Sequence, residues 1–217
     1  MARSALAQSV PAPAAGPGHD PDKRQQILEG AREVFLARGF DGASMGDIAL
    51  AAAVSKGTLY VYFENKQKLF AALVAEQCRQ TAERSFVLDA EDHDVRAALT
   101  RLGKSFVDGL MRPQHLATIR IVTAVADKLP ELGRIFIDSG PRAGVARLSD
   151  WLRTKIARGD LAIADVELAA WQFLALCQGP LLAPVLLGGE PRPSHARIDE
   201  VVARAVETFI AAYGRRG

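Results

Sequence analysis

The stretch that most constrains the fold of this chain runs from Ala53 to Phe63 and reads AVSKGTLYVYF. Ser55 is a good helix N-cap, because its hydroxyl can accept a hydrogen bond from a first-turn N–H that has no partner within the helix. Val54, just before the cap, and Leu59 can form a hydrophobic staple across it. Leu59 and Phe63 are four residues apart and therefore share one face. The pattern predicts a short helix after Ser55 whose Leu59–Phe63 face is buried.

The opposite face of this helix carries aromatic and hydroxyl side chains next to a lysine. Lys56 opens the helix, and the face consists of Gly57, Thr58, Tyr60, Val61 and Tyr62. Two outward tyrosines are unfavourable on an ordinary surface helix, but they suit a face that meets a large ligand. A short helix with a small N-terminus, a lysine and hydroxyl-bearing aromatics is suited to the major groove of DNA.

The residues before Ser55 complete the unit. Ser44 can cap a helix that runs to about Ala52, with Asp47 at the third position as a shortened capping box. Ile48 and Ala52 supply the inward face of that helix. Helix, short turn and helix form the helix-turn-helix motif. The alternative is a three-helix unit that contacts other protein instead of DNA.

The residues of this motif match those of a known protein family. They are GF at 39–40, SMGDIA at 44–49, VSKGTLYVYF at 54–63, NK at 65–66 and Leu69. Over about residues 22–74 the chain thereby resembles the tetracycline-repressor (TetR) family. One departure is Ala53, where the family often has Gly; if this position has a positive φ, Ala costs about 1 kcal/mol. A second is Tyr62, where many members have His, and Tyr keeps the hydrogen-bond donor.

The resemblance assigns roles on DNA to ten residues. Lys56, Gly57 and Val61 correspond to base-facing positions. Lysine can bind the edge of guanine, glycine permits close approach to the bases, and valine can contact the methyl group of thymine. The phosphate-facing positions are Ser44, Ser55, Thr58, Tyr60, Tyr62 and Lys66. Lys68, near the same helix start, is also within expected reach of phosphate. Hydroxyl and ammonium groups are natural partners of phosphate oxygens.

Charge sets a limit on how the chain can hold DNA. The net charge is only +2, and around the motif seven Lys and Arg against six Asp and Glu leave +1. Binding to the phosphate backbone must therefore come from the placement of a few cations and not from bulk charge.

The remaining chain shows helical periodicity, and neither strand alternation nor a repeat is visible. We expect an all-α protein of about nine helices, including a long helix capped by Asn65 that links the two parts and an interruption at 139–141. Three segments are expected: a disordered arm at 1–20, rich in Ala and Pro; a helix-turn-helix DNA-binding domain at 21–66; and a helical effector-binding and dimerisation domain at 67–217.

Family members use the C-terminal part to bind a small effector and to form dimers, and this chain offers candidates for both roles. An apolar pocket with a few polar groups is predicted from Phe106, Arg120, Trp151, Trp171, Gln172 and Gln178. The alternative is that these residues are ordinary core. The last two helices carry more apolar surface than one subunit can hide, including the stripe Val201, Val202, Ala205 and Phe209. A two-fold interface between copies would cover it.

Other classes of function find little support. Cys78 and Cys177 sit in apolar helical patterns and are predicted to be buried free thiols. No metal-ligand cluster, phosphate loop or nucleophile–base pair is visible, so we expect no enzyme, no metal and no cofactor. Residues 168–188 are long enough to span a bilayer, but two glutamines and two prolines favour a buried or interface helix. No signal peptide is evident, and the protein is expected to be cytoplasmic.

The sequence therefore predicts a homodimeric, DNA-binding transcriptional regulator, a repressor that a small apolar or amphipathic effector releases from a pseudo-palindromic operator. Three alternatives stay open. They are an activator of the same fold, a regulator without an effector, and a ligand-binding or protein-interaction module with a vestigial helix-turn-helix.

Overall fold

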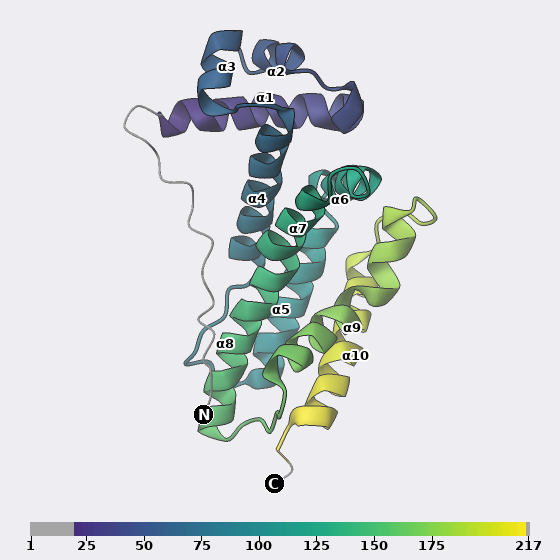
Figure 1. Ribbon diagram of the computed structural model, residues 1–217. Helices are drawn as coiled ribbons and strands as arrows, with labels where there is room; N and C mark the ends of the chain where they lie inside the picture. Colours follow the sequence, from purple (N-terminus) through teal and green to yellow (C-terminus); the bar gives the residue numbers. More distant parts are fainter. Residues whose placement is uncertain (1–19, 216–217) are drawn as a thin grey trace.

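Ten α-helices and one π-helical turn form the fold of residues 20–215, which the computed structural model describes (Figure 1). The elements are α1 (Pro21–Gly42), α2 (Met45–Ala51), α3 (Lys56–Tyr62), α4 (Lys66–Ser85), α5 (Val95–Leu110), α6 (Pro113–Val125), α7 (Pro130–Ile137), η1 (Asp138–Arg142), α8 (Ala143–Arg158), α9 (Val166–Leu186) and α10 (His195–Tyr213). Over these residues no strand is present, which confirms the all-α prediction. The predicted arm lies outside the described residues, except for Asp20.

The α7, η1 and α8 segments follow one another without a gap and form one continuous rod. Counted in this way, the described residues contain nine helical rods, the expected number. The predicted interruption is in the right place, but the chain does not leave the helix there. It widens into a π-turn around Pro141, which has no N–H to donate to the preceding turn.

The first helix begins and ends as its sequence predicts. Asp20 caps α1 by accepting a hydrogen bond from the Asp22 N–H at 2.9 Å, and Pro21 occupies the first turn. Gly39 has a φ of +67°, which kinks the helix near its end. In the middle of α1, a Cβ on Gly30 would lie 2.5 Å from the backbone N of Ala52, so only glycine lets α1 and α2 approach this closely.

The helix-turn-helix consists of α2 and α3, packed on one side of α1 (Figure 1). Leu59 is 0% exposed and Phe63 is buried, which confirms the inward face of α3. Beneath them Phe35, Phe40 and Phe70 form a cluster with ring centroids 4.8–6.0 Å apart. The turn contains Ala53 with a φ of +50°, the left-handed conformation that was expected to be unfavourable for Ala.

The long helix α4 links this unit to the C-terminal helices (Figure 1). It begins after its N-cap Asn65, as predicted, and ends before Phe86. The hydrophobic core around α1–α3 continues along α4 and takes in Val122, Val125 and Leu132 of α6 and α7. The DNA-binding unit therefore packs against α6 as well as against α4, and α7 joins the same core through α4.

The second core lies among α5, α8, α9 and α10, and it corrects the basis of the predicted dimer. All four residues of the α10 stripe are buried within one subunit: Val201, Val202, Ala205 and Phe209. They pack against α5 and α9; the Phe209 ring lies 5.5 Å from Phe173, and a Cβ on Gly103 would lie 2.7 Å from Val202. A second copy is therefore not needed to cover this stripe.

Among the described residues, α9 is the one helix long and apolar enough to cross a membrane. Pro180 and Pro184 lie within it, and its Phe173, Leu174 and Cys177 are buried in the protein core. This packing accounts for the apolar residues on one side of α9, while Leu168 and Leu176 remain exposed on another.

The left-handed Ala53 yields a stability prediction. Ala53→Gly is expected to raise the free energy of unfolding by about 1 kcal/mol, because glycine has no Cβ to clash at positive φ. Denaturant unfolding measures this. The matched control is Ala51→Gly at the exposed end of α2, which is expected to lower stability by about 0.5–1 kcal/mol because glycine loses more chain entropy in a helix. Destabilisation by both variants would contradict the strain at Ala53.

Candidate nucleic-acid interface and ligand cavity

The recognition face is formed by the side of α3 that points away from the core. Tyr60 and Val61 are 53% and 64% exposed, while Leu59 between α3 and α1 is completely buried. Lys56 and Gly57 at the start of α3 are exposed as well. The four residues form an open face of two turns, with one cation, one phenol and one branched apolar side chain.

Capping fixes both helices of the motif. Ser55 Oγ accepts a hydrogen bond from the Thr58 N–H at 3.0 Å, and the two hydroxyls lie 2.9 Å apart. Ser44 Oγ accepts from the Asp47 N–H at 3.1 Å and donates to the Asp47 carboxylate at 2.6 Å. Ser44 and Ser55 thus hold the helix starts, and both remain exposed. The Ser44 hydroxyl, helped by the guanidinium of Arg38, lowers the pKa of Asp47.

Tyr62 ties the end of α3 to the start of α1. Its hydroxyl accepts a hydrogen bond from the Asp20 N–H at 3.0 Å, and the side chain is partly buried. The contact holds the two ends of the DNA-binding unit together. The assignment of Tyr62 to phosphate stays a prediction.

Lys66 requires a correction. Its ammonium donates to the carbonyls of Phe40 at 2.7 Å and Ala43 at 2.9 Å, with Asp41 at 3.4 Å. It also lies 4.5 Å from the centre of the Phe40 ring. All three N–H bonds of the ammonium have acceptors in the protein, so Lys66 is a structural link between the end of α1 and the start of α4. Of the two predicted cations near this helix start, Lys68 is the exposed one.

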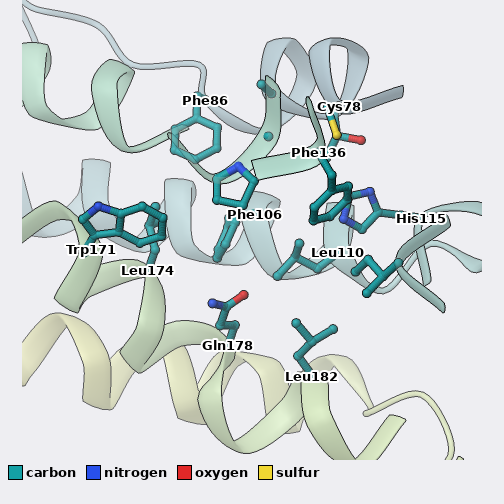
Figure 2. Close-up of a pocket in the computed structure, with 15 residues that line it drawn as sticks. Cys78, Phe86, Phe106, Leu110, His115, Phe136, Trp171, Leu174, Gln178 and Leu182 are labelled. Carbon is teal, nitrogen blue, oxygen red and sulfur yellow. The ribbon is translucent and has the colours of Figure 1, made fainter. Parts of the chain in front are cut away.

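An apolar cavity of about 220 Å³ lies in the C-terminal part (Figure 2). Its walls come from α4, α5, α6, α7, η1 and α9. The lining residues are Cys78, Thr81, Ala82, Phe86, Phe106, Leu110, His115, Ile119, Phe136, Gly140, Pro141, Trp171, Leu174, Gln178 and Leu182. Of the six predicted pocket residues, the structure brings Phe106, Trp171 and Gln178 together here.

The cavity presents polar groups but no charged side chain among its lining residues. Burial lowers the pKa of His115 to about 4, so the imidazole is neutral at physiological pH. Burial raises the pKa of the Cys78 thiol to about 12, so it stays protonated, and both cysteines are buried and free, as predicted. Figure 2 shows His115 beside Phe136, whose ring centroid is 6.2 Å away, and Gln178 on another wall.

The other three predicted pocket residues lie elsewhere, which corrects their assignment. Trp151 is core: its indole N–H donates to the Asp89 carbonyl at 2.8 Å. Arg120 donates to the carbonyls of Leu186 and Val185 and so caps the end of α9. Gln172 is exposed and accepts a hydrogen bond from the Tyr213 hydroxyl at 2.5 Å. Helical periodicity identifies a buried face, but it does not say which neighbour that face meets.

Sequence reasoning missed most of the cavity because its walls come from six separate elements. Thr81 and Ala82 of α4 were not singled out, and Cys78 was predicted only as a buried free thiol. A Cβ on Gly140 of η1 would lie 3.2 Å from Cys78 Sγ, so the glycine permits a close approach of η1 to α4. The one local signal was the break at 139–141, because π-turns within helices often occur at functional sites.

The two halves match two known families of sequences. Residues 27–73 match the profile described as bacterial regulatory proteins, tetR family. Residues 97–215 match the profile described as AefR-like transcriptional repressor, C-terminal domain. The second match alone covers more than half of the chain.

Individual relatives agree with these profiles. The repressor AcnR of Corynebacterium efficiens is 40% identical over 62 residues, which are 29% of this chain and 33% of AcnR, so the match spans about a third of that relative. The repressor DhaR of Mycobacterium sp. strain GP1 is 36% identical over 169 residues, covering 69% of this chain and 78% of DhaR.

Solved structures share the whole fold. A TetR-family transcriptional regulator from Mesorhizobium loti superposes with a TM-score of 0.84 at 28% identity, over 89% of this chain and 98% of that one. The flavonoid-responsive regulator FrrA superposes with a TM-score of 0.78 at 30% identity, over 91% of this chain and all of FrrA.

The two lysines at the start of α4 are expected to respond differently to substitution. Lys66→Gln should lower the free energy of unfolding by about 1.5–3 kcal/mol, the range for hydrogen bonds to a charged group. Lys68→Gln should leave stability within about 0.5 kcal/mol, because the side chain is exposed. It should weaken DNA binding and reduce the slope of log affinity against log salt by about one unit. Thermal unfolding and salt-titrated DNA binding separate the two; a stable Lys66→Gln protein would overturn the correction.

Proposed function

The chain belongs to the TetR family of transcriptional regulators, and we propose that it is a homodimeric repressor that a small-molecule effector releases from a pseudo-palindromic operator. The single observation that carries the proposal is the exposed face of α3. Tyr60 and Val61 are open to solvent on a helix whose other side is anchored by Leu59. A large aromatic and a branched apolar group on such an anchored surface are explained by a nucleic-acid partner.

The exposure of this face supports the following proposed contacts with bases and phosphates. Lys56, Gly57 and Val61 at the open face are assigned to base edges. Ser44, Ser55, Thr58, Tyr60 and Tyr62 are assigned to phosphates, together with Lys68. Lys66 is omitted, because its ammonium is held by backbone carbonyls. Since DNA is the partner, the protein works in the cytoplasm.

The dimer is proposed to form through the outer face of α9 and α10. Leu168 and Leu176 of α9 are 51% and 41% exposed. Two shallow grooves run beside Leu176, and most of their lining residues are small or apolar: Ala175, Gly179, Pro180, Ala205, Thr208 and Ala212. Small side chains let helices of two copies approach closely, and a two-fold axis lets one patch cover itself. The second copy then sets the recognition helices about 34–36 Å apart, or a multiple of that.

The cavity is proposed to bind the effector. It adjoins Thr81 and Ala82 of α4, the same helix that starts beside α3. An occupant that displaces α4 therefore moves the recognition helix. Because no charged side chain lines the cavity, an uncharged effector with aromatic or apolar groups suits it, with His115 and Gln178 to fix its polar end. A flavonoid, the class named for FrrA, has this chemistry.

Operator selection tests the proposal. The purified protein is incubated with random duplexes, and the retained fragments are sequenced; we expect an inverted repeat. Tyr60→Ala should weaken binding of that repeat by roughly 1–3 kcal/mol with little change in melting temperature, since Tyr60 lies off the core. Recovery of no preferred sequence would favour a vestigial helix-turn-helix and overturn the proposed function.

Leu176→Asp is expected to break the dimer. It places a carboxylate in the centre of the proposed apolar interface, where desolvation is unfavourable. The subunit should stay folded, because Leu176 is 41% exposed in the monomer. Val87→Asp, at a 79% exposed position outside this face, is the control and should remain dimeric. Light scattering gives the mass of each variant, and a monomeric wild-type protein would end the dimer proposal.

A further inference from the structure

A second cavity lies on the side of α1 that faces α4 and α6, away from the recognition helix. Its volume is about 380 Å³, and it is lined by Glu29, Arg32, Gln77, Gln80, Thr81, Arg84, Arg112, Gln114 and His115. These residues come from α1, from α4 and from the start of α6 with its N-cap. Every one of the nine is polar, in contrast to the walls of the effector cavity.

The charges in this cavity are unbalanced. It contains three guanidinium groups and one carboxylate, and that carboxylate, Glu29, pairs with Arg32 at 2.6 Å. Within residues 20–215, Arg84 and Arg112 have no acidic partner for their side chains. Three cations that line one recess repel one another, and a bound anion would relieve that repulsion.

Hydrogen-bond donors outnumber acceptors in this recess, because its three guanidinium groups can only donate. The Gln77 carbonyl already accepts from Thr118, so its amide nitrogen is the group left to donate. A ligand that accepts hydrogen bonds therefore complements the recess.

We propose that this cavity binds a small oxyanion, a phosphate or carboxylate compound, between the arginines of three different elements. Guanidinium forks match the planar oxygen pairs of carboxylates and phosphates, which makes arginine the favoured residue for such ligands. The volume exceeds that of a single phosphate ion, so a larger phosphorylated or polycarboxylate metabolite fits as well.

The position of the site gives it a regulatory consequence. Arg32 belongs to α1 of the DNA-binding unit, whereas Arg84 ends α4 and Arg112 precedes α6. An anion held by all three fixes the DNA-binding unit at one angle to the C-terminal helices. If the anion changes the affinity of the protein for its operator by some factor, thermodynamic linkage requires that the operator change the affinity for the anion by the same factor. This consequence rests on the proposed function, whereas the anion site itself does not.

The site also shares a wall with the effector cavity. Thr81 and His115 line both recesses. One side of this wall is apolar and uncharged, and the other carries the unpaired arginines. An occupant of either cavity therefore touches the same two side chains.

Calorimetry with two probes tests the site without DNA. Inorganic phosphate and succinate are titrated separately into the full-length protein at constant ionic strength set with chloride. We expect one site per subunit, with Arg112→Gln weakening binding at least about tenfold, as for loss of a charge-assisted hydrogen bond. Arg147→Gln, the same charge change at an exposed position of α8 outside the cavity, should bind like the wild type. Binding of phosphate alone or succinate alone would support the proposal and identify the class.

Two results would overturn the site: no binding of either anion, or equal binding by the wild type and Arg112→Gln. Lys56→Gln reports whether the anion sits on the recognition face, and loss of binding in that variant would also overturn it. Operator affinity is then measured with and without the saturating anion. We expect a change of at least roughly fivefold that Arg112→Gln abolishes. If a selective operator is found but the anion leaves the affinity for it unchanged, the anion does not link α1 to the C-terminal helices. If no selective operator is found, the proposed function is refuted instead.

Discussion

The ammonium group of Lys66 ties the helix-turn-helix unit to the helix that leads into the C-terminal part. Lys66 joins the last turn of α1 to the first turn of α4 through the carbonyls of Phe40 and Ala43. The ammonium also lies over the Phe40 ring, which belongs to the phenylalanine cluster beneath the helix-turn-helix. The link couples the start of α4 to the end of α1, so a tilt of α4 is expected to carry α1 and the recognition helix with it. Thr81 lies fifteen residues further along α4, a distance of about 22 Å in a helix, and there it lines both cavities.

The helix caps, the buried helix faces and the turn could be predicted from the sequence, because each depends on residues that are close together in the chain. The caps at Ser44, Ser55 and Asn65 each require only a side-chain oxygen and an N–H three residues away. The buried Leu59–Phe63 face follows from a four-residue spacing, and the left-handed turn at Ala53 follows from the motif that surrounds it. For the same reason the all-α class and the course of α4 were predictable.

Contacts between segments that are far apart in the chain could not be predicted from the sequence. Trp151 and Arg120 are on helices with correct apolar stripes, yet their partners, Asp89 and the end of α9, lie more than sixty residues away. The stripe of α10 was correctly recognised as buried, but α5 and α9 cover it, not a second subunit. Lys66 is the clearest example of a contact that the sequence alone does not determine. Its residue type suits phosphate and backbone carbonyls equally, and only the position of α1 decides between them.

The separation of charge between the two cavities has a physical cause. A charged side chain in the effector cavity would lose its hydration without a partner, so that recess is lined with rings, aliphatic groups and a neutral imidazole. The arginines lie on the other side of His115 and Thr81, where Arg84 and Arg112 are exposed. This arrangement lets each recess select a different chemistry although the two are adjacent. Because α4 borders both recesses and is tied to α1 by Lys66, the two proposed ligands would act on the recognition helix through the same helix.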